Sequence, residues 1–520
     1  MSTEQALLEF WNNTVVKLFR NDNTREDAVD FIKADLLNVM PKYKRISDCI
    51  GGNDTIKKNP TEYLPVPNPT DKSEYNKYRY KSYVEKAVFY PFLQQTTLGL
   101  IGLCFIYDPL CNLPKDLDKF KSNVDGSGDI YQFSRKTLAM NINYSRAGIL
   151  ADYPSISDAS LRDSENTEPS ILLYSPMDII NWRESVIDNK KVLTLVVLKE
   201  CHDSTEYKFK QEIEESWRVL SLVDDIKQNK KIYKVTIYKR DKKDKRKFSI
   251  DSEFYPKIGG KSLEFIPFIF LGAESNSPDV CQPQMDAIAC LNIGHYRNSA
   301  DYEDSCHTVG QPTPVITGLT EKWAKDILKD RLQFGSKTWI PLPSGASAEL
   351  LQAQPNTMPF EAMKHKEQQA VSIGAKLIQP SNVTKTATES TMEKSEENSI
   401  LTCTSKNTSI AIRQAIVWAY MFKTGKMEVN QDEIKFELRT ESALTAMSPN
   451  ERNQLMQEYM NGAITFAEYR SNLRSAGVAT EDLENAPTPP VQPNQKAGDV
   501  SSNGTVNPSN GRDFIGNKNN

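Results

Sequence analysis

Four residues with metal-binding side chains lie in one stretch that is predicted to be helical: Cys290, His295, Cys306 and His307. Five residues turn an α-helix by about 500°, so Cys290 and His295 fall on different faces. Cys306 returns to the face of His295, but at about 1.5 Å per residue it lies about 16 Å away. A zinc ion needs its ligands about 2 Å from one point. We therefore expect buried thiols and polar helix residues here, and no metal site.

The common catalytic and phosphate-binding motifs are missing from the sequence. The nearest approach to a P-loop, Thr424-Gly-Lys-Met427, lacks the glycine five residues before Gly425 and the hydroxyl that would hold Mg²⁺. There is no G-x-S-x-G elbow and no H-E-x-x-H pair. We therefore expect that the protein is not an enzyme and has no catalytic residues, no cofactor and no metal.

Two clusters of basic residues could seek phosphate groups or a protein partner. The run at 239–247 holds seven basic and two acidic residues. It is either a phosphate-binding or localisation patch or, as we favour, a solvated hairpin tip between two predicted strands. A second cluster lies on a predicted helix over 321–332 and consists of Lys322, Lys325, Lys329 and Arg331. Most such clusters are solvated faces, and partner contact is the alternative.

The overall charge limits what the chain can bind. In 520 residues, 64 Lys and Arg stand against 68 Asp and Glu, which gives a net charge of −4. This balance argues against a protein that coats nucleic acid by bulk attraction. The hydrophobic fraction of 38% is low, which is typical of a large soluble protein with several structural units and much surface or interface.

Membrane insertion and export are not indicated. The longest apolar run, Leu98 to Ile106, is about half of the ~20 residues that span a bilayer. The N-terminus shows no basic and apolar regions of a signal peptide. The eight cysteines are scattered without a C-x-x-C pair, which is typical of reduced, mostly buried thiols in a cytosolic product.

The N-terminal third is predicted to be mainly helical. Apolar residues recur at three- and four-residue steps near the start, at Leu7, Leu8, Trp11, Val15, Leu18 and Phe19. Asn21 to Thr24 breaks this helix, and Pro41 is expected to end the next one. The Gly- and Pro-rich stretch 51–70 predicts a loop, and 75–90 predicts a further helix.

The rest of the chain changes character twice. Runs rich in β-branched and aromatic residues predict antiparallel strands between 170 and 275. Helical spacing follows at 283–309, 360–378 and 388–422. Between the first two of these helices, a strand at 312–318, a helix at 321–332 and a strand at 338–343 predict a small αβ insert. Ser448 begins a pair of short helices around Gly462, and from 486 onward we expect a disordered tail.

An ordered series of segments resembles one family, the tailed-phage portal (head-to-tail connector) proteins, in a branch typical of short-tailed phages. The most telling stretch is Leu291-Asn-Ile-Gly-His-Tyr-Arg-Asn-Ser-Ala-Asp-Tyr-Glu303. The other segments that carry the resemblance are 88–105, 123–128, 145–154, 180–183, 310–318, 373–378 and 386–390. No single motif is chemically unique, and the resemblance extends over roughly 80–475.

The resemblance implies an α+β fold of portal-type architecture with a wing, two stem helices, a clip, a long wing helix and a helical crown-like part. The implied division is 1–170 mainly helical wing, 171–275 β-rich wing, 276–309 stem helix, 310–357 clip, 358–378 second stem helix, 379–388 tunnel loop, 389–447 long wing helix and strands, 448–485 crown-like helices and 486–520 disordered tail.

The resemblance also implies a function. Twelve identical subunits would form a ring at one capsid vertex of the virion, made in the host bacterial cytoplasm, and double-stranded DNA would pass through it. Implied partners are terminase, tail adaptors, and major capsid and scaffolding proteins. Asn382, Thr384 and Lys385 would be DNA contacts in the tunnel loop. The alternatives are another virion ring component, such as a head-completion or tail-adaptor ring, and a nucleic-acid enzyme with scattered carboxylates.

Overall fold

The structure is a computed structural model of the chain. It describes residues 28–475 except 127, 154–167, 188, 204–212, 226–229, 242–243, 245–246, 310–312, 324, 327–341, 352–355, 379–399 and 439–448. Contacts divide the chain into two compact units, Met1–Thr440 and Glu441–Asn520. The described residues form a mixed α+β fold with helices and antiparallel sheets. The predicted tail from 486 lies outside them.

A three-stranded sheet lies at the centre of the first unit. Strand β2 (Arg146–Asp152) pairs on both sides, with β3 (Ser170–Tyr174) and with β11 (Phe268–Gly272). Helices α7 (Ile130–Tyr144) and α13 (Ile400–Thr424) pack against it. Gly148 is required in β2, because a Cβ there would lie 2.2 Å from the Phe268 ring. The long helix α13 thus packs on a sheet whose central strand has no side chain at Gly148.

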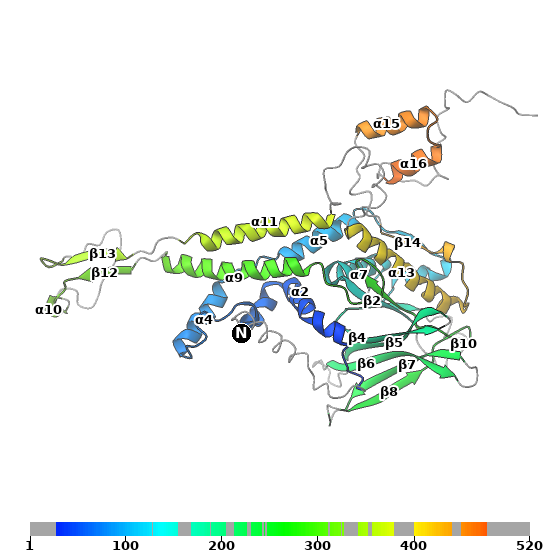
Figure 1. Ribbon diagram of the computed structural model, residues 1–520, viewed down its shortest axis with the longest axis horizontal. Coiled ribbons are helices and arrows are strands. Elements are labelled where there is room, and N and C mark those ends of the chain that lie inside the picture. Colours follow the sequence, from blue (N-terminus) through cyan, green and yellow to red (C-terminus); the bar gives the residue numbers. More distant parts are fainter. Residues whose placement is uncertain are drawn as a thin grey trace, which may run out of the picture. The chain divides into compact units, whose positions relative to one another are not determined.

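A second sheet has five strands in sequence order, all antiparallel, as Figure 1 shows. The strands are β4 (Ile179–Ile187), β5 (Lys190–Asp203), β6 (Ile213–Asp225), β7 (Lys230–Arg240) and β8 (Phe248–Phe254). Alternation along each strand sends Val196 and Leu220 toward the main core and Val197 and Trp217 to the opposite face. The expected antiparallel strands between 170 and 275 are confirmed.

Helix α2 (Ala34–Lys58) corrects two expectations. Pro41 does not end the helix, although a proline inside a helix removes a hydrogen bond and costs ~3 kcal/mol. The helix continues because Met40 and Tyr43, on either side of the proline, are both buried in the core. The stretch predicted as a loop at 51–70 is helical up to Lys58 and again in α3 (Pro60–Tyr63). Within α2, the backbone leaves the helical conformation at Gly52, whose φ is 76°.

Further short elements of the first unit contribute buried core residues, such as Leu93 and Phe120. They are α4 (Glu74–Lys86), α5 (Phe92–Cys104), β1 (Leu110–Asn112), η1 (Lys115–Leu117), α6 (Asp118–Ser122), β9 (Lys257–Ile258), β10 (Lys261–Ser262), η3 (Gln431–Glu433) and β14 (Lys435–Glu437). Strands β1 and β14 pair with each other although they lie far apart in sequence. Among these elements, α4 confirms the helix expected near 75–90, and it ends at Lys86.

The described part of the second unit is a pair of short helices, α15 (Pro449–Met460) and α16 (Phe466–Ser475). A capping box opens α16: Thr465 Oγ1 accepts from the Glu468 backbone N–H at 3.2 Å, and Glu468 Oε2 accepts from the Thr465 N–H at 2.8 Å. The stacked rings of Tyr459 and Tyr469, 5.1 Å apart, hold the two helices together. The predicted helix pair around Gly462 is confirmed.

Asn141 joins three elements of the core. Its Nδ2 donates to the Gly272 carbonyl at the end of β11 and to Thr408 Oγ1 on α13, at 3.2 and 3.1 Å. Removing this amide takes the donor from the buried Thr408 hydroxyl oxygen, whereas the Gly272 carbonyl keeps a second donor, Asn407 Nδ2, at 3.2 Å. We expect Asn141→Ala to lower the free energy of unfolding by about 1–3 kcal/mol, measured by urea denaturation. The exposed Asn112→Ala is the control, and an equal loss in both variants would contradict this role.

Candidate functional site

Helices α9 (Asp286–Val309) and α11 (Met358–Ile378) pack against each other as an antiparallel pair (Figure 1). His295 of α9 faces Glu367 of α11, and further along α9 the ring of Tyr302 lies 5.8 Å from that of Phe360. The predicted helices at 283–309 and 360–378 are confirmed. The pair is the scaffold from which the segment between the two helices extends.

The segment between α9 and α11 forms an antiparallel hairpin of β12 (Thr313–Thr317) and β13 (Ser347–Leu351). A strand at 312–318 was expected, whereas β13 was not, because its Ala and Glu residues carry little strand preference. Of the expected helix at 321–332, the structure describes α10 (Glu321–Trp323) and residues 325–326. Most of the strand expected at 338–343 lies outside the described residues.

A clasp of polar side chains fixes α9 to the segment 88–93, which links α4 and α5. Asn292 Oδ1 accepts from the Leu93 N–H at 3.2 Å, and its Nδ2 donates to the Tyr90 carbonyl at 2.6 Å. Ser299 Oγ accepts from the Val88 N–H and donates to the Val88 carbonyl, at 3.0 and 2.8 Å. Both side chains are buried, so they satisfy backbone groups that water does not reach. We call this set of contacts the 88–93 clasp.

Ionic contacts hold α9 to α2 and α4 along the rest of its length. Arg45 Nη1 lies 2.8 Å from Asp286 Oδ1 near the start of α9. The Tyr83 hydroxyl donates to Asp301 Oδ1 at 2.5 Å, and Lys86 Nζ lies 3.6 Å from Asp304 Oδ1. The N-terminal helices therefore brace α9 on one side while α11 packs along another.

His295 is a buried titratable group of the helix pair. Its side chain is 7% exposed, and its ring meets that of Phe92 edge-on at 4.9 Å. Nε2 lies 3.4 Å from Glu367 Oε1, whereas Nδ1 is buried without a hydrogen-bond partner. Burial lowers the pKa of His295, Glu367 opposes this and Lys366 adds to it. The fold therefore favours the neutral imidazole.

The four predicted metal-ligand candidates do not converge. Cys290 is exposed, and Arg45 Nη1 lies 2.7 Å from its Sγ, while His295 is buried on another side of α9. Cys306 and His307 are exposed near the end of the helix. Within the described ranges, no three His, Cys, Asp or Glu side chains are placed to hold a metal ion.

The thiols differ from the expectation of mostly buried cysteines. All eight are free, but only Cys49 and Cys104 are buried, and burial raises their pKa to about 12. The exposed thiols are Cys201, Cys290 and Cys306. The expectation is wrong because Cys290 and Cys306 lie off the apolar stripe of α9, where a small side chain remains open to solvent.

The predicted site residues are only partly visible. Lys322 and Lys325 are exposed. Lys325 Nζ lies 2.7 Å from Glu321 Oε1, an ion pair between side chains four residues apart that is common on solvated surfaces. Lys329 and Arg331 lie outside the described residues. So do all three tunnel-loop candidates, Asn382, Thr384 and Lys385.

The described residues of the basic run at 239–247 join the paired ends of β7 and β8, as expected of a hairpin, and residues 242–243 and 245–246 lie outside the described residues. Arg240 of β7 stands opposite Phe248 of β8, and the Asp241 N–H donates to the Lys247 carbonyl at 2.9 Å. Lys239 Nζ lies 3.0 Å from Asp251 Oδ1, so part of the basic charge is balanced across the hairpin.

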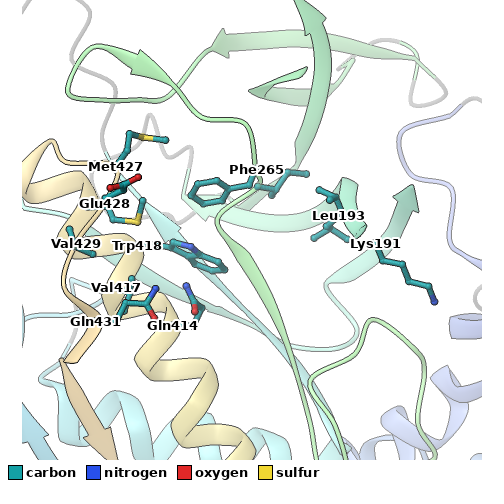
Figure 2. A pocket seen from close by; sticks show the side chains of 13 residues that line it. Lys191, Leu193, Phe265, Gln414, Val417, Trp418, Met427, Glu428, Val429 and Gln431 are labelled. Carbon is teal, nitrogen blue, oxygen red and sulfur yellow. The ribbon is translucent and has the colours of Figure 1, made fainter. Parts of the chain in front are cut away.

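Figure 2 shows a groove of about 630 Å³ beside the C-terminal half of α13. The rings of Phe265 and Trp418 lie 6.0 Å apart in its wall, and Met427 approaches the same space. The charged side chains among its described lining residues are Lys191 and Glu428, and no Ser, Cys or His lines it. This lining suits an apolar contact and provides no nucleophile.

Comparisons with known proteins give one family match and several similar structures. Residues 284–423, from α9 to α13, match a family model described as "Domain of unknown function (DUF4055)". No curated protein matches the chain. No helix in the described part of the chain is long and apolar enough to cross a bilayer.

Two of the similar structures come from gene transfer agent (GTA) particles. A chain of the "Neck of empty GTA particle computed with C6 symmetry" is 12% identical, with a TM-score of 0.38, over 74% of this chain and 90% of that one. A chain of the "Virion of native gene transfer agent (GTA) particle" is 13% identical, also at 0.38, over 76% and 92%. At these low identities and TM-scores, the similarity says nothing about the role of this chain.

The 88–93 clasp makes a testable contribution to stability. We expect Asn292→Ala to lower the free energy of unfolding, at about 1–3 kcal/mol for each buried backbone group left without a partner. Chemical denaturation of the variant measures this loss. The half-buried Asn298 on the same helix provides a matched control, and Asn298→Ala should change stability little. A neutral effect of Asn292→Ala would contradict the clasp.

The buried imidazole predicts a dependence on pH. The folded-state pKa of His295 lies below its ordinary value. The folded state is therefore more stable at neutral pH, where the ring is neutral, than at acidic pH, where the ring must take up a proton. This extra stability is lost as pH falls from about 6.5 through the folded-state pKa. We expect that His295→Gln loses less stability than the wild type between pH 7 and pH 5. Thermal unfolding at each pH measures this loss. His365→Gln, at an exposed histidine of α11, should keep the wild-type slope, and identical slopes in all three proteins would contradict the prediction.

Proposed function

We propose that this chain is the portal subunit of a tailed-phage particle, a ring-forming protein through which double-stranded DNA enters and leaves the capsid. The observation that carries this proposal is the helix–hairpin–helix order of α9, β12–β13 and α11. It agrees with the stem, clip and stem arrangement that the sequence resemblance implies. In this proposal α9 and α11 line the opening and the five-stranded sheet lies at the periphery.

The 88–93 clasp supports a stem role for α9. A helix that lines a ring opening is loaded from one side by neighbouring copies and by DNA, so its orientation needs fixing from the other side. Asn292 and Ser299 provide this through backbone hydrogen bonds, and Asp286 and Asp301 add contacts to α2 and α4. Heterologous contacts between identical subunits close into a ring when the rotation per subunit permits it.

The charge balance supports a conduit. Duplex DNA carries one negative charge per about 1.7 Å, and a strongly basic lining would hold it in place. A chain with a net charge of −4 can enclose DNA without gripping it along its whole surface. The sequence of the proposed tunnel loop, 379–388, holds one basic residue, Lys385, beside the polar Asn382 and Thr384. Repeated around the ring, Lys385 would form a narrow belt of positive charge.

The β12–β13 hairpin is the proposed clip, which would dock the packaging ATPase terminase and later the tail adaptors. Lys322 and Lys325 are exposed beside it and are proposed contacts, together with Lys329 and Arg331. Val315 and Leu350, exposed by 38% and 67%, add apolar surface to the hairpin. An apolar centre with a polar rim is typical of a protein contact, and the basic residues would lie on that rim.

Mass measurement and imaging of the purified full chain test the ring. We expect native mass spectrometry to give an integral multiple of the 58.8 kDa subunit, and negative-stain images to show a ring with a central opening. A compact monomer at all concentrations would contradict the proposal. The enzyme alternative predicts Mg²⁺-stimulated cleavage of phosphodiester bonds, which we expect to be missing.

The tunnel-loop proposal is tested by reversing one charge. Lys385→Glu should alter DNA packaging or retention, because a belt of cations around the duplex becomes a belt of anions, and it should leave ring assembly intact. The matched control is Lys435→Glu at an exposed lysine of β14, which should package normally. Normal packaging by Lys385→Glu would overturn the assigned contact.

A further inference from the structure

The five-stranded sheet buries a second apolar cluster on the face that points away from the main core. Ile180, Val197 and Trp217 are only 3%, 4% and 2% exposed. Leu195, Val219, Tyr238 and Phe248 pack against them from the same sheet. A sheet with apolar side chains on both faces needs a covering layer on each. The main core covers one face, so the other needs a cover of its own.

Residues 29–33, at the start of the described chain, cover part of this outer face. Among the described apolar residues, Val29 and Ile32 pack on the cluster from outside the sheet. Arg240 Nη2 lies 3.4 Å from Asp30 Oδ2, and the Lys33 N–H donates to the Ile180 carbonyl at 3.0 Å. The chain therefore crosses the free edge of β4 at Lys33.

Residues 5–20, which precede this point, have the pattern of a helix with one apolar face. At 100° per residue, six apolar positions fall within an arc of about 120°, whereas Phe10 and Val16 fall outside it: the six are Leu7, Leu8, Trp11, Val15, Leu18 and Phe19. The opposite side carries Glu9, Asn13, Lys17 and Arg20. An isolated helix of this length is marginal in water, so its apolar face needs a surface to pack on.

The lengths of helix, linker and sheet agree. Sixteen residues make a helix of about 24 Å, and five strands at about 4.8 Å spacing are about 19 Å from first to last. The linker from 21 to 28 can span up to about 28 Å. We propose that residues 5–20 form a helix that lies across the outer face of β4–β8 of the same chain, with Trp11 and Val15 against the Trp217 cluster.

This cover has a consequence for assembly. Strands β4 and β8 are the edges of the sheet, and an uncovered apolar face between two open edges favours aggregation. The covering helix would keep this face out of unspecific contacts while other surfaces of the subunit assemble. The inference is independent of the proposed function, because it applies to the chain as a monomer or in a ring.

Cross-linking of the full chain locates the segment. A photoreactive benzoyl-phenylalanine in place of Trp11 should cross-link to peptides of β5, β6 or β7, as read by mass spectrometry. The same group in place of Asn13, on the opposite side of the helix, should give few or none of these products. Cross-links from Trp11 to any other region would overturn the proposal.

Isotope labelling separates the same chain from a neighbouring one. In a mixture of ¹⁴N and ¹⁵N protein, we expect cross-linked peptide pairs of uniform label. Mixed-label pairs would assign the helix to a neighbouring subunit and so contradict the proposal. Native mass spectrometry tests the proposed ring separately. Failure of the docked helix can therefore be distinguished from failure of the proposed portal function.

Hydrogen exchange gives a second readout with matched variants. Val15→Asp places a charge on the apolar side of the helix, and we expect about tenfold faster amide exchange in residues 5–20 because docking is weakened. Asn13→Asp adds the same charge on the polar side and should leave the exchange unchanged. Equal exchange in the wild type and both variants would count against docking.

Discussion

The buried amide of Asn292 is the interaction on which the arrangement of this chain depends. It lies on the core face of α9, where an unpaired polar group would be costly, and it is satisfied only when Tyr90 and Leu93 present their backbone groups. Together with Ser299, this side chain ties α9 to the segment between α4 and α5. Because α11 and the β12–β13 hairpin follow from α9, their placement depends on the same contact.

Much of the local structure could be predicted from the sequence because its causes are local. Alternation of β-branched residues between 170 and 275 indicates strands, and the apolar stripe through Ile293 and Tyr296 indicates α9. Local rules fail where packing outweighs them. Pro41 does not end α2, since the buried residues around it hold the helix on both sides.

The contacts that build the site were harder to predict. Asn292 is visible in the sequence as a polar residue within the apolar stripe of α9, and this signal could have marked it. Its partners could not be identified, because Tyr90 lies 202 residues away and a sequence does not show which backbone groups a fold leaves unpaired. The pairing of His295 with Glu367 likewise depends on how α9 meets α11. Lys385 stays a prediction.

The central claim is that α9 and α11 surround a passage for DNA. A cryo-EM reconstruction of the purified full chain tests it most directly, because it shows both the symmetry and the helices that face the axis. We predict a closed ring of identical copies whose opening is wide enough for a DNA duplex and is lined by α9 and α11. A monomer, or a ring whose opening is lined by β4–β8, would contradict this account.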